Sequence, residues 1–426
     1  MWNGSSGYKK FINIAFIIFI IIISFCINLK IKSEQYYFRK VCYAENIVNS
    51  EAKEKSDREE ELEKEVSDKI EDILGDIDSS ELDDFIDISI DIDFISSNSF
   101  IDIVKSILNN NYFGEYKSLF SQILNYFFVN IKEVFVFFFI IFVLVVINQI
   151  FDSFCEDKYK DFKIVINIIF SLVIALQIMG LLKDISSTIE EVVSRVFSYT
   201  EKLFPILLSL ILISGANGTH AVYSTLASFL METGMYLFKF VLFPIVSSII
   251  ILSVLSISFK NNKFSKLIIL LKSIFKCVLV CFFAILGIFS TINMFSSGVS
   301  DGVNYKLTKF ALKSYIPIIG GYISDGFDFV HTCSVLVKNA FGLCGIIVLF
   351  FTILKPFIVC IVYIFMFKIL SVLVSFVGKE KYANYFEGIS SSFTYYLSIL
   401  IGIFMCIFCF IFLLILSVSV VWWFIK

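Results

Sequence analysis

The residues best suited to chemistry gather in one stretch, 300–345, of an otherwise strongly apolar chain. Asp325 and Asp328 stand three residues apart there, so on a helix both carboxylates point to one side. Lysines recur at helical spacing before them, and a proline and two glycines between residues 316 and 321 interrupt the helix. Charged residues beside apolar spans commonly line aqueous paths when they face a bundle interior. Three interpretations are open: contact with water at the membrane surface, lining or gating of an aqueous path, and docking of a partner.

A second polar break lies earlier, where Ser214-Gly215-Ala216-Asn217-Gly218 forms a turn that needs a permissive backbone. The apolar arms on either side, 203–214 and 219–231, are both too short to cross a membrane comfortably. A re-entrant helical hairpin fits this region better than two full spans, because broken elements persist where protein or water covers them. The candidate pore-lining or partner-docking residues of the two regions are Gly215, Asn217, Gly218, Asp301, Lys309, Pro317, Gly320, Asp325, Asp328, Lys338 and Asn339.

Catalytic motifs are absent from the sequence, which has no phosphate-binding loop, zinc-protease helix motif, nucleophile elbow or dinucleotide-binding loop. His331 follows Asp328 by three residues, but a metal site needs further ligands, and His220 reads as a polar loop residue. Cys406 and Cys409 have CxxC spacing but lie inside an apolar run, which favours buried thiols. We therefore expect no enzyme, no cofactor, no metal and no nucleic-acid partner.

The elements that must position these residues follow from composition. Hydrophobic residues make up 58% of the chain, charged residues 17%, and the mean hydropathy is +0.86. A soluble domain has about 45–50% apolar and about 25% charged residues, so the excess needs a lipid-facing surface. Because a helix satisfies its own backbone within lipid, we expect an all-α fold. The predicted architecture is a polytopic integral membrane helix bundle of about six to eight spans, with an N-terminal signal or anchor and a re-entrant hairpin.

Three regions are expected. Residues 1–44 form a signal sequence or anchor, because two lysines precede a long apolar core and small residues follow; cleavage and retention are both open. Residues 45–130 form an acidic exported segment, with 21 acidic and five basic residues between 45 and 104. Alternating Ile and Asp over 86–94 favours an extended strand or a flexible tether. Residues 131–426 form the polytopic membrane domain.

Within this domain, an apolar stripe at 185–203 predicts an amphipathic helix, either on the membrane surface or packed on the bundle. The stretches 340–354 and 357–376 form one kinked helix or two tight passes around Lys355-Pro356. The loops 152–161 and 260–272 are expected in the cytoplasm, because lysines mark that side, and the acidic segment and 298–339 outside. Full spans are expected at 131–151, 162–182, 236–259, 275–295 and 393–425.

Several pieces of the 300–345 stretch together resemble the signature region of the stage III sporulation protein AE family of endospore-forming bacteria. The order of features, from signal sequence through acidic segment to a polytopic body with the Ser214-Gly215 turn, is also similar. The resemblance covers roughly 130–420. The matching pieces are Asp301-Gly302-Val303, Thr308-Lys309-Phe310-Ala311, Ile316-Pro317-Ile318-Ile319-Gly320, Ser324-Asp325 and Leu336-Val337-Lys338-Asn339-Ala340-Phe341-Gly342.

This resemblance implies a location in the mother-cell membrane around the engulfed forespore. It implies membership of an apparatus with other stage III sporulation proteins of the same operon and with stage II sporulation protein Q on the forespore side. Members of the family are thought to contribute to a channel that sustains forespore development, and no catalytic residues are defined for them. The lipid bilayer and, as a further option, copies of the same chain complete the expected partners.

Three functions are therefore weighed. The first is a membrane core subunit of that channel apparatus, passive or driven by its partners. The second is a self-contained secondary transporter, which glycine breaks near polar residues would suit. Against it, buried charges within the clear spans are few, mainly Lys239, Lys355 and Lys368. The third is a membrane scaffold that conducts nothing.

Overall fold

The computed structural model describes residues 68–75, 77, 80–86, 99–108, 116–154, 160–256, 263–315 and 320–425. The chain divides into two units, Met1–Ser67 and Asp68–Lys426, and the described residues all belong to the second. The expected signal sequence at 1–44 and nearly all of the alternating segment at 86–94 lie outside the described residues. In the part that is described, the chain is almost entirely helical and contains no strand.

Two short helices precede a set of long ones. They are α3 (Ser80–Ile86) and α4 (Phe100–Leu108). The long helices are α5 (Tyr116–Phe154), α6 (Lys160–Ile213), α9 (Lys263–Tyr315), α10 (Gly320–Phe376) and α11 (Glu380–Ile425). A composite helix lies between α6 and α9, made of α7 (Asn217–Phe229), the π-helical η3 (Leu230–Gly234) and η4 (Tyr236–Leu242), and α8 (Phe243–Leu255). Among the described residues, six helices are long and apolar enough to cross a membrane, which confirms the predicted all-α polytopic bundle.

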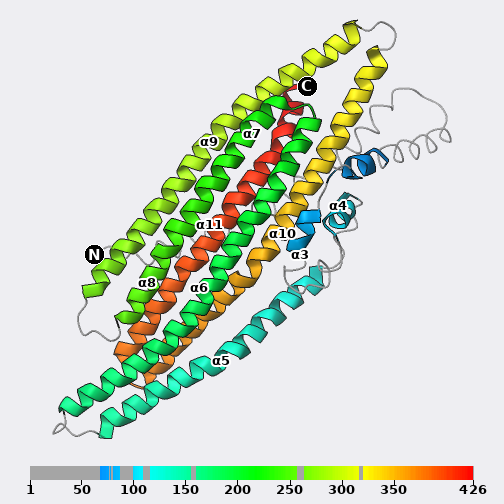
Figure 1. Cartoon of the computed structure of the whole chain (residues 1–426). Helices are drawn as coiled ribbons and strands as arrows, with labels where there is room; N and C mark the ends of the chain where they lie inside the picture. Colours follow the sequence, from blue (N-terminus) through cyan, green and yellow to red (C-terminus); the bar gives the residue numbers. More distant parts are fainter. Residues whose placement is uncertain are drawn as a thin grey trace. The chain divides into compact units, whose positions relative to one another are not determined.

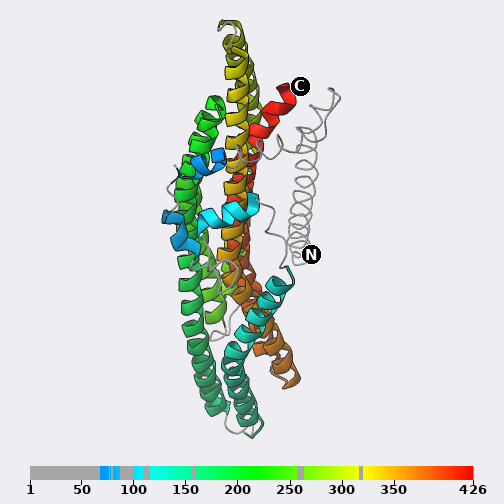
Figure 2. The same ribbon diagram turned by 90° about the vertical axis from the view of Figure 1, so that its right-hand side faces the viewer.

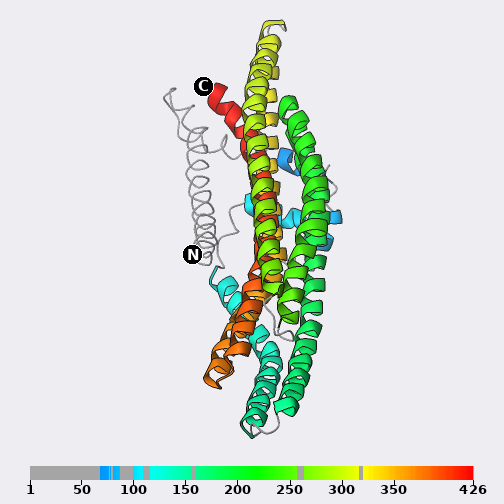
Figure 3. The same ribbon diagram turned by 90° about the vertical axis from the view of Figure 1, so that its left-hand side faces the viewer.

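Successive long helices run in opposite directions, as Figure 1 shows. We call the end where α5 meets α6, α8 meets α9 and α10 meets α11 the lower end, and the opposite end the upper end. The turn between α6 and α7, the last turns of α9 and the first turns of α10 lie at the upper end (Figure 1). Helix α11 packs along α10 and also contacts α6, α8 and α9, so it is the central helix of the bundle. Figure 3 shows α9 and the α7–α8 composite after a turn of 90°, with the left-hand side of Figure 1 facing the viewer.

An exposed apolar band surrounds the lower half of the bundle. It contains side chains of α5, the first part of α6, the first part of α9 and the last turns of α10. A band of this extent suits the acyl chains of a bilayer rather than water. Its members include Phe135, Val136, Phe139, Val165, Ile169, Leu176, Ile269, Leu270, Val280, Ile285, Phe365, Val372 and Phe376.

The core at the level of this band is mainly apolar, but several side chains of α11 join the surrounding helices by hydroxyl contacts. The Tyr396 hydroxyl lies 2.5 Å from Ser186 Oγ on α6 and 2.9 Å from Ser247 Oγ on α8. Ser392 Oγ lies 3.2 Å from Ser253 Oγ on α8. Such hydroxyl pairs hold helices together where lipid offers no hydrogen-bonding alternative. The final helix begins at Glu380, so the expected start at residue 393 was too late.

The expected re-entrant hairpin needs correction. Its two arms are not separate short helices: 203–213 is the end of the 54-residue α6, and 217–231 begins the composite helix that continues to Leu255. The amphipathic stripe of 185–203 lies within α6 and packs on the bundle, because its apolar face is buried. Helix α10 passes through Pro356 unbroken, so the one-helix alternative for 340–376 is the observed one.

The short helices α3 and α4 lie against α6 and α10 (Figure 2). The ring of Phe100 packs on that of Phe341, with centroids 5.4 Å apart. The Asp83 carboxylate accepts a 2.7 Å hydrogen bond from the Phe100 N–H, which caps the start of α4. The end of the acidic region is thus anchored to the helical bundle.

Two glycines let α10 approach its neighbours closely. A Cβ added at Gly345 would lie 2.6 Å from Leu203 Cδ2 of α6. At Gly342 it would lie 2.7 Å from Ile415 Cγ1 of α11. Small residues at helix contacts are typical of membrane bundles, because they allow the backbones to pack directly.

We expect Gly345→Val to lower the stability of the bundle by about 1–3 kcal/mol, because the fully buried Leu203 has little room to move aside. Thermal unfolding in detergent micelles measures the effect. Gly388→Ala is the control, since nothing lies within 4 Å of its added Cβ. Leu203→Ala in the same chain should recover part of the loss. Equal melting temperatures for Gly345→Val and the wild type would contradict the close packing.

Candidate functional site

The turn between α6 and α7 is the centre of the polar groups at the upper end. Gly215 has φ of +80°, a left-handed conformation that glycine adopts without strain. Its N–H donates to the Leu212 carbonyl at 2.9 Å, and the Ala216 N–H donates to the Ile211 carbonyl at 3.3 Å. This pair of bonds is a Schellman motif, which satisfies the last carbonyls of α6 and reverses the chain. The predicted need for a permissive backbone at this turn is explained by Gly215.

Asp301, on α9, holds the start of α7. Its carboxylate accepts hydrogen bonds of 2.7 Å from both the Gly218 and the Thr219 N–H groups. The residue before α7, Ala216, supplies no side-chain cap of its own. Asp301 is therefore an N-cap supplied from a distant helix, and its negative charge also complements the positive end of the α7 dipole. The side chain is only 3% exposed, which strengthens both effects.

His331, on α10, holds the other side of the same turn. Its Nδ1 lies 2.6 Å from the Ser214 carbonyl oxygen, so Nδ1 carries the proton and donates it. Its ring packs on that of Tyr305, with centroids 5.0 Å apart. The buried Nε2 has no hydrogen-bond partner among the described residues. The α6–α7 turn is thus held between one side chain of α9 and one of α10.

Asp328 links α9 to α10 beside this turn. Its carboxylate accepts hydrogen bonds from the Tyr305 hydroxyl and from the Lys309 ammonium, with which it forms an ion pair. Burial of Tyr305, followed by its contact with the Asp328 carboxylate, raises the pKa of the phenol. Tyr305 is therefore a hydrogen-bond donor throughout the physiological pH range.

Lys338 lies two helical turns beyond His331 and is completely buried. Its ammonium donates to the carbonyl oxygens of Leu414 at 2.9 Å and Ile415 at 3.2 Å, both on α11. Asn339 is half-buried, and its Oδ1 has no hydrogen-bond partner among the described residues. Lys338 thus joins α10 to α11, whereas Asp328 joins α10 to α9.

The structure brings some of the predicted residues together and separates others. Gly215, Gly218 and Asp301 meet at the α6–α7 turn, and Lys309 meets Asp328 beside it. Asn217 is exposed at the first residue of α7, and Gly320 is the first residue of α10. Pro317 lies outside the described residues, and of Asp325 only its position in α10 is described.

Sequence reasoning missed His331 and Tyr305 as members of this group. His331 was weighed only as a metal ligand, although its position seven residues from both Ser324 and Lys338 places all three on one face of α10. Among the described residues, no group of three or more metal-ligating side chains is present. The group at the upper end is instead a set of hydrogen bonds that fixes four helices relative to one another.

A second polar cluster at the lower end also escaped notice. Asp152, at the end of α5, forms an ion pair with Lys379 in the α10–α11 turn and accepts a 2.9 Å hydrogen bond from Asn167 Nδ2 of α6. The Tyr382 hydroxyl of α11 lies 2.8 Å from Ser171 Oγ and accepts a 3.0 Å hydrogen bond from Asn148 Nδ2. A loop was expected at 152–161, but nothing in the sequence indicated that Asp152 would lie beside the start of α11.

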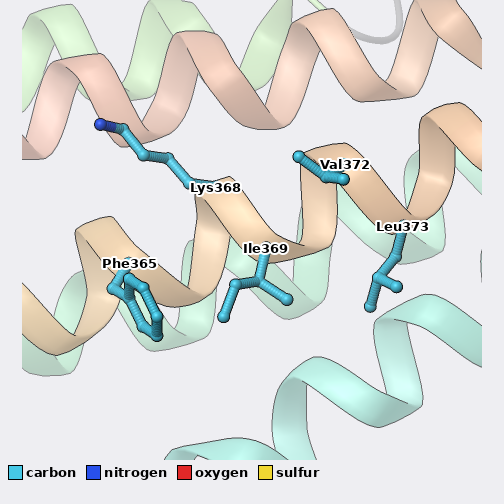
Figure 4. A pocket seen from close by; sticks show the side chains of 5 residues that line it. All are labelled: Phe365, Lys368, Ile369, Val372 and Leu373. Carbon is cyan, nitrogen blue, oxygen red and sulfur yellow. The ribbon is translucent and has the colours of Figure 1, made fainter.

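The shallow groove drawn in Figure 4 belongs to the apolar band rather than to either polar cluster. It is lined by side chains of α10, and Phe365, Ile369 and Leu373 lie on one side of the helix while Lys368 extends away from them (Figure 4). Exposed aliphatic and aromatic groups beside a lysine suit lipid chains, because a lysine can extend its ammonium toward the polar surface.

We expect Asp301→Ala to lower the stability of the bundle by about 3 kcal/mol, because two N–H groups at the start of α7 lose a charged acceptor. Asp301→Asn should lose only about 1 kcal/mol, since one acceptor oxygen remains. Thermal unfolding in detergent gives both values. Glu191→Ala is the matched control: its exposed i,i+4 pair with Arg195 at 2.9 Å should contribute less than about 0.5 kcal/mol. A loss no larger for Asp301→Ala than for Glu191→Ala would contradict the capping role.

Fold and site together define a polytopic helical membrane protein whose upper end is fixed by charged side chains from neighbouring helices. The family model for stage III sporulation protein AE matches residues 98–419, so the chain belongs to this sporulation family. The predicted family is thereby confirmed. A curated relative, stage III sporulation protein AE of Bacillus subtilis (strain 168), is 29% identical over 206 residues, which are 48% of this chain and 51% of the relative. The match thus spans about half of the curated relative's length. No solved structure matches the chain.

Proposed function

We propose that this protein is a membrane core subunit of a multi-protein channel apparatus between mother cell and forespore, required for endospore development. Its partners would be other stage III sporulation proteins of the same operon and stage II sporulation protein Q, as the family resemblance implies. Its role would be passive or driven by these partners, because the sequence carries no nucleotide-binding loop.

The observation that carries the proposal is the length of the helices relative to a bilayer. Helix α6 has 54 residues, so it is about 80 Å long, whereas the hydrocarbon core is about 30 Å thick. Between Leu176 and Leu212, no large hydrophobic side chain of α6 is among the exposed ones. The segment 183–213, about 45 Å long, therefore extends out of the bilayer as a packed helical body.

Charge supports one orientation of this body. Among the described residues, lysines gather at the lower end, at 160–163, 263–266 and 379–381, and the positive-inside rule places such an end in the cytoplasm. The upper end would then face the space between the two membranes. A protruding bundle in that position could meet proteins anchored in the opposite membrane, which a subunit buried in lipid could not do.

Removal of this subunit tests the proposal. In liposomes that contain the reconstituted complex, we expect solute flux to fall to the level of empty liposomes when this chain is omitted. Complexes that lack the chain but still pass solutes at the normal rate would contradict the proposal. Liposomes that contain the chain alone are the control and should show no flux.

A self-contained permease is the second candidate, because a seam of hydroxyl groups runs beside α11 at the level of the apolar band. Its members include Ser253, Ser392 and Tyr396. Polar groups inside a bundle at this depth are found along substrate paths as well as at helix contacts. Flux through liposomes that contain the chain alone would favour this candidate over the complex subunit.

Charge reversal separates a conducting subunit from a scaffold. We expect Asp328→Lys to reduce flux through the complete complex about fivefold, equivalent to ~1 kcal/mol, because it places two lysines beside each other on α9 and α10. Asp328→Lys combined with Lys309→Asp should restore most of the flux. Co-purification of the complex from detergent provides the assembly control. Unchanged flux, or a loss of flux only together with a loss of assembly, would favour the scaffold.

A further inference from the structure

An apolar stripe runs along the outer face of α9 at its upper end. Val303, Leu307 and Phe310 are 53%, 60% and 68% exposed. Their spacing of four and three residues places them on one side of the helix. Asp301 and Lys309 project from other sides, toward α7 and α10. We call Val303, Leu307 and Phe310 the α9 stripe.

The lipid that surrounds the lower half does not reach this stripe. The apolar span expected for α9 from the sequence ends at residue 295, and Val303 and Phe310 lie about 12 Å and about 22 Å further along the helix. The interfacial layer beyond the hydrocarbon core is only about 5–8 Å thick on each side. Figure 3 shows this end of α9, in yellow, continuing past the start of α7. The exposure of large apolar side chains here therefore calls for a protein partner.

Charge indicates what that partner carries. Between Asp301 and Asp325 the sequence contains three lysines and no acidic residue. Lys306 is exposed and lies at the edge of the stripe by helical position. An apolar row with basic neighbours complements an apolar row with acidic neighbours.

We propose that the α9 stripe binds an acidic amphipathic helix of another protein in the apparatus. The facing helix would present apolar residues at i, i+3 or i+4, and i+7 to Val303, Leu307 and Phe310, and acidic residues to Lys306. This is the usual geometry by which one helix recognises the apolar face of another. The proposal rests on the proposed function only in that the partner belongs to the same complex.

Photocrosslinking tests it. A photoreactive benzoylphenylalanine replaces Leu307 in the full-length chain. Sporulating cells carry this variant as their only copy of the protein. We expect an adduct with a different protein, and mass spectrometry should map it to a helix with acidic residues beside its apolar row. Val303→Glu in the same chain should lower the adduct yield about tenfold, because it removes an apolar contact and adds a repelling charge.

The same photoreactive residue at Thr308 is the matched control, since Thr308 is exposed on another side of α9. It should give no such adduct. An adduct with a second copy of this chain, an adduct with lipid, or no adduct at Leu307 would overturn the docking proposal. Co-purification of the operon's other sporulation proteins from the same cells is measured in parallel. If they co-purify without an adduct, only the docking proposal fails; if they do not co-purify, the proposed function fails as well.

Discussion

The carboxylate of Asp301, on α9, satisfies the start of α7, which lies more than eighty positions earlier in the chain. A helix that begins inside a protein has N–H groups without partners, and they must be satisfied before the helix can be buried. Helix α7 begins directly after a tight turn and carries no cap of its own, so the acceptor has to come from α9. Two further residues of α9, Tyr305 and Lys309, contact Asp328 on α10. His331 of α10 in turn donates a hydrogen bond to the α6–α7 turn. The arrangement of four helices at the upper end thus depends on one buried acceptor.

The two halves of the bundle are held by different physics. In the lower half, apolar side chains face outward and hydroxyl groups lie inside around α11, because lipid removes the hydrophobic advantage of burial and favours internal hydrogen bonds. In the upper half, many apolar side chains are buried between the helices, as the rings of Phe204 and Phe410 are with centroids 4.4 Å apart, whereas the α9 stripe stays exposed. Charged groups there cap and pair instead.

Much of this architecture follows from the sequence, and the rest has identifiable reasons for being hidden. Long apolar runs were sufficient to predict an all-helical membrane bundle, and the stripe in 185–203 marked the face of α6 that is buried. The lengths of the helices could not be predicted from the same apolar runs, because every drop in hydropathy was interpreted as the end of a helix. The start of α11 was missed since Tyr382, Tyr385 and Ser390 look like loop residues, although they are buried and hydrogen-bonded inside the bundle. Of the site, Gly218 and Asp301 were identified, but their hydrogen bond joins residues more than eighty positions apart, which spacing alone does not reveal.

The π-helical segments η3 and η4 affect which face of α8 points toward α11. A π turn holds more residues than an α turn, so it rotates all that follows relative to what precedes it. Removing one residue from 230–242 would restore ordinary winding and swing α8 by about 100° around its axis. Ser247 and Ser253 would then turn from α11 toward the outside of the bundle. The number of residues in this segment, and not only their chemical character, therefore determines how α8 is rotated relative to α7.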